Sequence, residues 1–120
     1  MKPKIDKTKF GSITIAGEKY ENDVFIRLDG KIKKRKKKLS KEIYGTSHIV
    51  SLAEIQSIYE PGAERLIFGT GQSGQANLSP EAMDFLQEHQ CRFDLSPTPR
   101  AREEWNSASG AVIGLFHITC

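Results

Sequence analysis

The second half of the chain alternates short apolar segments with amphipathic helices, and this order restricts the fold more than any other feature. Ser51-Leu52-Ala53-Glu54 is a capping box that starts the first of three helices; its serine oxygen accepts an N–H bond and its glutamate reaches back. Ser79-Pro80 and Thr98-Pro99 start the other two, because proline in the first helical turn loses no hydrogen bond. Apolar segments typical of strands lie at residues 65–69, 91–95 and 112–117. This order favours an α/β domain with largely parallel central strands and right-handed crossovers.

The first half of the chain adds antiparallel strands. Residues 10–16 and 24–28 alternate with strand periodicity, and Asp29-Gly30 is a strong hairpin signal because glycine accepts positive φ. A third strand, exposed and lysine-rich, is expected through residues 31–38. We therefore predict an α/β protein with a single three-layer domain over residues 1–120. Its N-terminal β-hairpin is followed by alternating helices and strands, and helices cover both faces of a mixed central sheet.

Size and composition narrow the class of protein. With 120 residues, of which 38% are hydrophobic, the chain suits one buried core. No apolar run is long enough to span a membrane, and no apolar segment follows the charged start as it would in a secretory signal. The two cysteines are too few for a disulfide scaffold. We expect a cytoplasmic protein that is a monomer or a weak homo-oligomer, with no cofactor.

Most of the positive charge lies in one short run. Its basic residues are Lys31, Lys33, Lys34, Arg35, Lys36, Lys37 and Lys38. Removing these seven from 18 basic residues leaves 11 against 15 acidic ones, so the rest of the chain is mildly acidic. We expect the run to repel itself and to stay in water. Binding of nucleic acid is not favoured, because no aromatic residue lies inside the run to stack on bases, and such binding would depend on phosphate and weaken with salt.

A glycine-rich loop follows the apolar segment at 65–69. The spacing of Gly69, Gly71 and Gly74 matches the G-x-G-x-x-G of dinucleotide-binding folds. In those folds the next helix begins inside the motif, whereas here the cap is Ser79, five residues later. The spacing therefore favours a shaped surface loop over a nucleotide site.

The same loop could still border a ligand crevice. In an open α/β sheet, ligands bind beyond the carboxyl ends of the strands, where Gln72 and Ser73 could face Thr98 and Arg100. Free N–H groups at a helix start and a nearby guanidinium would suit a small anion or a carboxylate of a partner. The alternative, which we favour, is that Thr98 only caps its helix and Arg100 is only solvated.

The three histidines give little evidence of chemistry. His89 lies on the apolar stripe of its helix, where packing or capping is the simplest role. His117 and Cys120 have a ligand-like spacing that His48 could complete, but nothing in the sequence brings these residues together, and we predict no metal site. No catalytic combination of nucleophile, histidine and carboxylate can be recognised from spacing. The catalytic residues, if any, are therefore unknown.

Four motifs in register resemble the Mth938-domain family. The ending Gly114-Leu115-Phe116-His117-Ile118-Thr119-Cys120 is similar to its G-x-F-H-x-T-C, Leu66-Ile67-Phe68-Gly69-Thr70-Gly71 to its strand and glycine turn, and Gly45-Thr46-Ser47-His48 to its G-T-x-H. Trp105-Asn106 before the last strand also fits. The resemblance implies a three-layer α/β fold with a mixed sheet and no established catalytic residues. Relatives include an assembly factor of respiratory complex I and a protein linked to adipocyte differentiation. One departure is that tryptophans of the family are replaced here by the basic run.

Three hypotheses about function follow. The first is a non-enzymatic interaction or assembly module with protein partners, which both the resemblance and the lack of a catalytic pattern favour. The second is a binding protein or an enzyme that takes a small molecule or anion through the Gly69–Gly74 loop. The third is weak, non-specific binding of nucleic acid through Lys31–Lys38.

Overall fold

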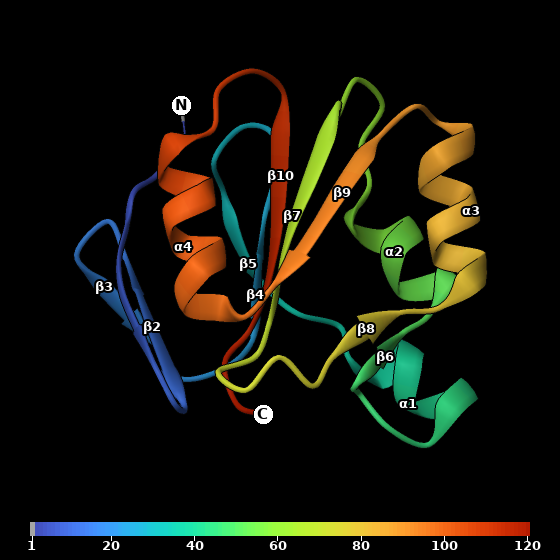
Figure 1. Ribbon diagram of the computed structural model, residues 1–120, viewed down its shortest axis with the longest axis horizontal. Coiled ribbons are helices and arrows are strands. Elements are labelled where there is room, and N and C mark those ends of the chain that lie inside the picture. The colour runs from blue at the N-terminus through green and yellow to red at the C-terminus, as the bar shows by residue number, and fades with distance from the viewer. Residues whose placement is uncertain (1) are drawn as a thin grey trace.

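A five-stranded sheet with the order β5-β4-β10-β7-β9 forms the centre of the computed structural model, which describes residues 2–120 (Figure 1). The strands are β1 (Ile5–Lys9), β2 (Ser12–Ile15), β3 (Glu18–Tyr20), β4 (Val24–Ile26), β5 (Ile32–Lys34), β6 (Ile49–Val50), β7 (Arg65–Thr70), β8 (Asn77–Leu78), β9 (Arg92–Ser96) and β10 (Val112–His117). The helices are α1 (Lys38–Tyr44), α2 (Leu52–Ile58), α3 (Pro80–Glu88) and α4 (Thr98–Ser107).

The central sheet is mixed, as the sequence predicts. β10 runs parallel to β7, and β7 runs parallel to β9, whereas β4 is antiparallel to both β10 and β5. Helix α4 and the separate β1-β2-β3 sheet lie on one side of this sheet, and α2 and α3 lie on the other (Figure 1). The prediction of a layered α/β fold with helices on both faces is confirmed.

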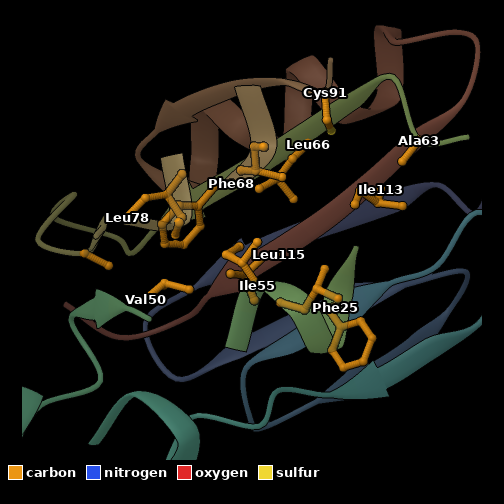
Figure 2. Packing of buried hydrophobic residues seen from close by; sticks show 14 residues of the cluster. Phe25, Val50, Ile55, Ala63, Leu66, Phe68, Leu78, Cys91, Ile113 and Leu115 are labelled. Carbon is orange, nitrogen blue, oxygen red and sulfur yellow. The ribbon is translucent and has the colours of Figure 1, made fainter. Parts of the chain in front are cut away.

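Alternate residues of the two central strands pack into two different cores. Leu66, Phe68, Ile113 and Leu115 contribute to the core under α2 and α3 (Figure 2). Their neighbours in the strands, which include Ile67 and Phe116, contribute to the core under α4. Because both faces of a strand with this environment are buried, its sequence is a continuous apolar run rather than an alternating one. This explains why 112–117 could be predicted as a strand with correct bounds.

Helix α4 is fixed to the sheet by a buried tryptophan. The Trp105 ring lies edge-on to Phe116, with the ring centroids 5.8 Å apart. Gly114 makes this contact possible, because a Cβ there would lie 2.9 Å from the Trp105 ring. Trp105 Nε1 also donates a 2.8 Å hydrogen bond to the carbonyl oxygen of Pro3, so the start of the described chain is held against the helix.

The sequence missed several short elements. The charged strand β1, with Ile5 as its buried anchor, pairs with β2, which covers the middle of the segment predicted at 10–16. Helix α1 and the two-residue strands β6 and β8 were also not expected. Within residues 2–120, no helix has both the length and the apolar character needed to cross a membrane.

Candidate functional site

The carboxyl ends of the three parallel strands lie side by side at one edge of the sheet. Gly69 of β7 is opposite both Phe116 of β10 and Ser96 of β9, so the segments that follow these strands meet at this edge. In open α/β sheets ligands bind at this kind of edge. The polar residues gathered here form the candidate site.

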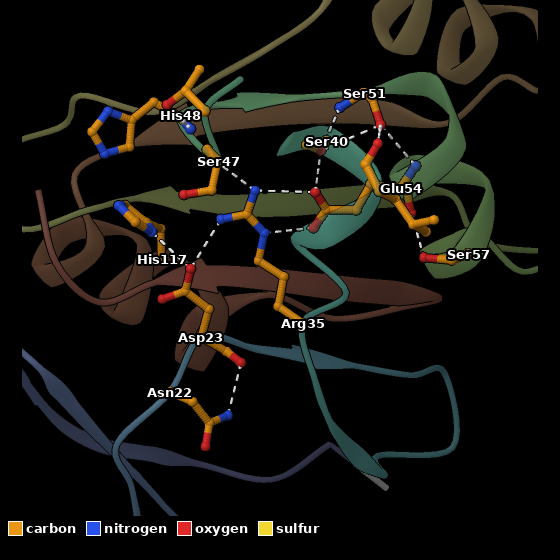
Figure 3. Close-up of polar contacts among 12 residues, drawn as sticks. Asn22, Asp23, Arg35, Ser40, Ser47, His48, Ser51, Glu54, Ser57 and His117 are labelled. Carbon is orange, nitrogen blue, oxygen red and sulfur yellow. Dashed lines mark hydrogen bonds and ion pairs between the residues drawn. The ribbon is translucent and has the colours of Figure 1, made fainter. Parts of the chain in front are cut away.

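Arg35 is the centre of a buried polar cluster (Figure 3). Its Nε and Nη2 donate to the two carboxylate oxygens of Glu54 at 2.5 and 3.1 Å, and its Nη1 donates to Asp23 Oδ2 at 2.9 Å. Nη2 also donates to the carbonyl oxygen of Ser47 at 2.7 Å. Burial alone would lower the pKa of Arg35, but the hydrogen bonds and charges of Glu54 and Asp23 outweigh burial and raise it.

The position of Arg35 corrects the expectation that the whole basic run stays in water. Arg35 is only 3% exposed, while the six lysines around it are exposed, so one member of the run belongs to the interior. The reason is chemical, because a planar guanidinium can bind a carboxylate with two parallel bonds and lysine cannot.

Glu54 also departs from its expected role. Ser51 Oγ accepts the Glu54 N–H at 3.2 Å, which confirms the serine half of the capping box. The Glu54 carboxylate does not return to the Ser51 N–H, which instead donates to Ser40 Oγ at 2.9 Å. Ser40 Oγ donates to Glu54 Oε1, so helix α1 is bound to helix α2 through the same carboxylate that holds Arg35.

Asp23 joins this cluster to His117 at the end of β10. Its Oδ2 lies 2.7 Å from His117 Nδ1, and its Oδ1 accepts the Ile118 N–H at 2.9 Å. Burial alone would raise the pKa of Asp23, but the hydrogen bond and charge of His117, the Ile118 N–H and the charge of Arg35 together lower it. Asp23 is thereby held as a carboxylate between a guanidinium and an imidazole.

The other nitrogen of His117 faces the last described residues. Nε2 lies 3.3 Å from Thr119 Oγ1, and the His48 ring lies edge-on with its centroid 5.4 Å from that of His117. The two histidines singled out in the sequence are therefore neighbours, although they lie 69 positions apart in the chain. Among residues 2–120, the structure holds no group of three or more histidine, cysteine or acidic side chains that could bind a metal.

The glycine loop and the start of α4 are also neighbours at this edge. Thr98 N donates to the Gly71 carbonyl oxygen at 2.9 Å, and Gly71 N donates to Thr98 Oγ1 at 2.9 Å. Thr98 Oγ1 in turn donates to the His117 carbonyl oxygen at 2.6 Å. The Thr98 hydroxyl thus ties two loops together and makes no helix-capping bond, which corrects the capping role expected for it.

The N–H groups of the glycine loop are used inside the protein. Gln72 N donates to the Thr119 carbonyl oxygen, and Gly74 N to that of Gly71. Two of the glycines serve close packing, because a Cβ at Gly69 would lie 2.9 Å from Thr98 Oγ1 and one at Gly71 would lie 2.8 Å from His117 Cδ2. The loop is therefore not built like a phosphate cradle, whose N–H groups point at the ligand.

The structure does not bring Arg100 to this loop. Arg100 is 75% exposed, lies 3.8 Å from Glu104, and borders a different hollow beside α4. A hollow of about 340 Å³ does lie between the loop and the end of β9. Its lining carries no charged side chain and consists of Thr70, Ser73, Gly74, Ala76, Asn77, Leu95, Ser96 and Pro97.

His89 has the simple role expected for it. It follows the last residue of α3, and its Nδ1 lies 2.8 Å from the Phe85 carbonyl oxygen, so it caps the helix end.

Reasoning from the sequence missed Asp23, Ser40, Glu54 and Thr119 as members of the site. One signal was available, since Arg35 is the single arginine in a run of lysines. If the run served only solubility, a lysine would do as well as an arginine at this position. A buried ion pair, in contrast, needs the several donors of a guanidinium in their fixed geometry.

Comparison with known proteins places the chain in a family. The sequence pattern of the family described as "Protein of unknown function (DUF498/DUF598)" matches residues 5–113. The chain belongs to this family. Two solved structures with similarity to this DUF498/DUF598 chain share 28% of its sequence. They are the conserved hypothetical protein PH1505 from Pyrococcus horikoshii OT3, with a TM-score of 0.87, and MT938, with a TM-score of 0.82. Each comparison covers 98% of this chain and 99% of the other.

A more distant structure shows the same fold. A Bordetella pertussis protein described as a Mth938-like domain is 14% identical and has a TM-score of 0.65, and the comparison covers 97% of this chain and 85% of the other. The family match and the similarity to MT938 confirm the predicted membership in the Mth938-domain family. Neither the description of the DUF498/DUF598 family nor the names of these similar proteins assign a biochemical function.

Proposed function

We propose that this protein is an interaction or assembly module that docks an acidic segment of a partner protein on its lysine-rich segment, residues 31–41. The observation that carries the proposal is the way the basic side chains of this segment are divided between the protein interior and the solvent. Arg35 is neutralised inside the protein, while seven lysines remain in solvent. Within residues 2–120, none of these seven lysines forms an ion pair.

The surroundings of these lysines favour a protein over a nucleic acid. β5 is an edge strand of the central sheet, so its outer backbone groups can pair with an extended peptide. Ile43, on the next helix, is 60% exposed and offers an apolar anchor beside the positive charge. Neither feature assists binding to phosphates, which needs only the charge. The rest of the chain is mildly acidic and would repel an acidic partner elsewhere.

A reducing compartment such as the cytoplasm suits this role. Cys91 and Cys120 are both free thiols, one buried and one exposed. An exposed thiol persists most readily where the surroundings are reducing.

Binding of a glutamate-rich peptide that contains valine, measured by fluorescence anisotropy, tests the proposal. The triple variant Lys36→Gln, Lys37→Gln, Lys38→Gln removes three charges from the docking segment. The matched control, Lys4→Gln, Lys7→Gln, Lys9→Gln, removes three exposed lysines from β1 and the residue before it, outside the docking segment. We expect the first triple to weaken peptide binding about tenfold and the control to change it little.

Two results would overturn the proposal. One is an equal loss of peptide affinity in both triple variants, which would show a response to net charge alone. The other is tighter binding of single-stranded or duplex DNA than of the peptide at the same salt concentration, which would favour a nucleic-acid role.

A further inference from the structure

Asp23, His117 and Thr119 form a line of carboxylate, imidazole and hydroxyl that the docking role does not use. Asp23 Oδ2 lies 2.7 Å from His117 Nδ1, and His117 Nε2 lies 3.3 Å from Thr119 Oγ1. Asp23 and His117 are buried, and Thr119 is half-buried and so reachable from solvent. A base held by a third group within reach of a hydroxyl is the general arrangement of an activated nucleophile.

The carboxylate fixes the imidazole in the form that such a reaction needs. Arg35 and the Ile118 N–H hold Asp23 in place, and Asp23 accepts the proton on His117 Nδ1 as a hydrogen bond. The Nε2 lone pair is then free to accept the proton of the Thr119 hydroxyl. His117 cannot turn away easily, because the edge of its ring packs against Gly71.

An independent observation comes from Gln72. Within residues 2–120, its Nε2 is a buried side-chain nitrogen without a hydrogen-bond partner. Such a donor is costly to bury, so its presence needs an explanation. The backbone of Gln72 lies next to that of Thr119, because Gln72 N donates to the Thr119 carbonyl oxygen at 2.7 Å. An unpaired amide donor that turns toward a nucleophile can bind the oxyanion of an acyl-transfer intermediate.

The charges of the cluster indicate the class of substrate. One guanidinium faces two carboxylates, those of Asp23 and Glu54, so with His117 in the neutral form that acts as a base the buried groups carry net negative charge. Anionic phosphates are disfavoured beside such a cluster, whereas a neutral carbonyl compound is accepted.

We propose that Thr119 is an acyl-accepting nucleophile that uses His117 as its base and takes the acyl group from a neutral, activated carboxylic ester. Thr119 Oγ1 attacks the ester carbon while its proton moves to His117 Nε2. The tetrahedral intermediate then expels the alcohol, which takes the proton from His117, and an acyl-threonine remains. Water, deprotonated by the same nitrogen, hydrolyses the acyl-threonine to the carboxylic acid and restores the hydroxyl. Ester and water are the only reactants that these steps consume.

The test uses p-nitrophenyl acetate and the full chain carrying Cys120→Ser, so that the exposed thiol does not compete. We expect a burst of p-nitrophenolate and one acetyl group on Thr119, located by peptide mass spectrometry. Thr119→Ser, which keeps a hydroxyl, should still be acetylated at this position. Thr119→Val keeps the shape without the hydroxyl and should lose the burst.

Gln72→Met tests the amide separately. Loss of an oxyanion donor should slow acylation by about 10²-fold. The denaturation midpoint should stay equal or rise, because a buried orphan donor has been removed. A purely structural role would instead lower the midpoint and leave acylation unchanged, which would overturn the role of Gln72.

Acetyl groups found only on lysines, or an equal burst in Thr119→Val, would overturn the proposal itself. Neither outcome bears on peptide docking, because Thr119 lies outside residues 31–41.

Discussion

The Arg35 guanidinium holds both carboxylate oxygens of Glu54, 19 residues further along the chain, and neither side chain is exposed to solvent. This pair connects the end of the lysine-rich edge of the sheet to helix α2. Through Asp23 it also connects that edge to the end of β10.

Replacing Arg35 by methionine should strongly destabilise the protein. The change leaves the carboxylates of Glu54 and Asp23 buried without their cation, which typically costs about 3–5 kcal/mol. Urea unfolding gives the free energy directly. The control is Lys34→Met in the same run, an exposed position at which a change within about 0.5 kcal/mol is expected. Similar losses in both variants would mean that Arg35 acts only as one more charge of the run.

The stability of the protein should fall at acidic pH as Asp23 becomes protonated. The pKa of Asp23 is lower in the folded protein than its ordinary value of 3.8, so the unfolded chain binds this proton more tightly. The stability that Asp23 contributes is therefore complete above the unfolded value and is lost as pH falls through the lower folded value. Urea unfolding of the parent and of Asp23→Asn from about pH 6 to about pH 2 measures this. The difference between the two should narrow as the solution becomes acidic, and parallel curves would contradict the assignment.

Alanine at Gly71 should destabilise far more than alanine at Gly62. Both glycines have positive φ, +108° and +96°, so both variants bear a backbone cost of about 1–2 kcal/mol. Only the Gly71 Cβ would also collide with other atoms, at 2.3 Å from the Cys120 carbonyl carbon and 2.8 Å from His117 Cδ2, whereas no atom lies within 4 Å at Gly62. Overpacking adds about 1–3 kcal/mol. Thermal denaturation of the two variants separates the backbone cost from the cost of overpacking. Equal losses of stability in both variants would show that the loop can move away from His117.

The two cysteines should differ in reactivity. Burial raises the pKa of the Cys91 thiol to about 11, so very little of the reactive thiolate forms near neutral pH. Cys120 is exposed. Iodoacetamide should therefore label Cys120 in the folded protein and label Cys91 only after unfolding, as mass spectrometry would show. Labelling of Cys91 in the folded Cys120→Ser variant would indicate that the edge near β9 opens.

Local patterns were enough to predict the central layers of the fold. Ser51 and Ser79 mark helix starts because each caps a helix within three residues. The apolar run at 112–117 marks a strand because every residue in it is buried. β1 could not be recognised as a strand from its sequence. Ile5 is its only fully buried residue, and the other residues resemble those of a charged loop. Helix α1 lies in a lysine-rich segment with no acidic residue in its first turn to mark its start.

The candidate site could be predicted only in part. His48 and His117 were recognised as separate candidates. The glycine loop and Thr98 were considered as borders of one crevice, but the favoured prediction gave Thr98 only a capping role, whereas in the structure its hydroxyl is bonded to the loop. The ion pairs of Arg35 were not visible, because they join residues 12 and 19 positions apart and depend on how β4, β5 and α2 pack. Arg100 was predicted as a site residue because it follows β9 in the chain. In the structure its side chain lies near Glu104, one helical turn away.

β10 lies between β4 and β7, although it follows both of them in the chain. On a ribosome, the earlier strands would emerge with their central neighbour still missing, and the two halves of the sheet would have no partner to join them. The native topology therefore becomes available only after Val112–His117 has been synthesised, so a chaperone that holds the nascent chain until then would have its greatest effect before this point.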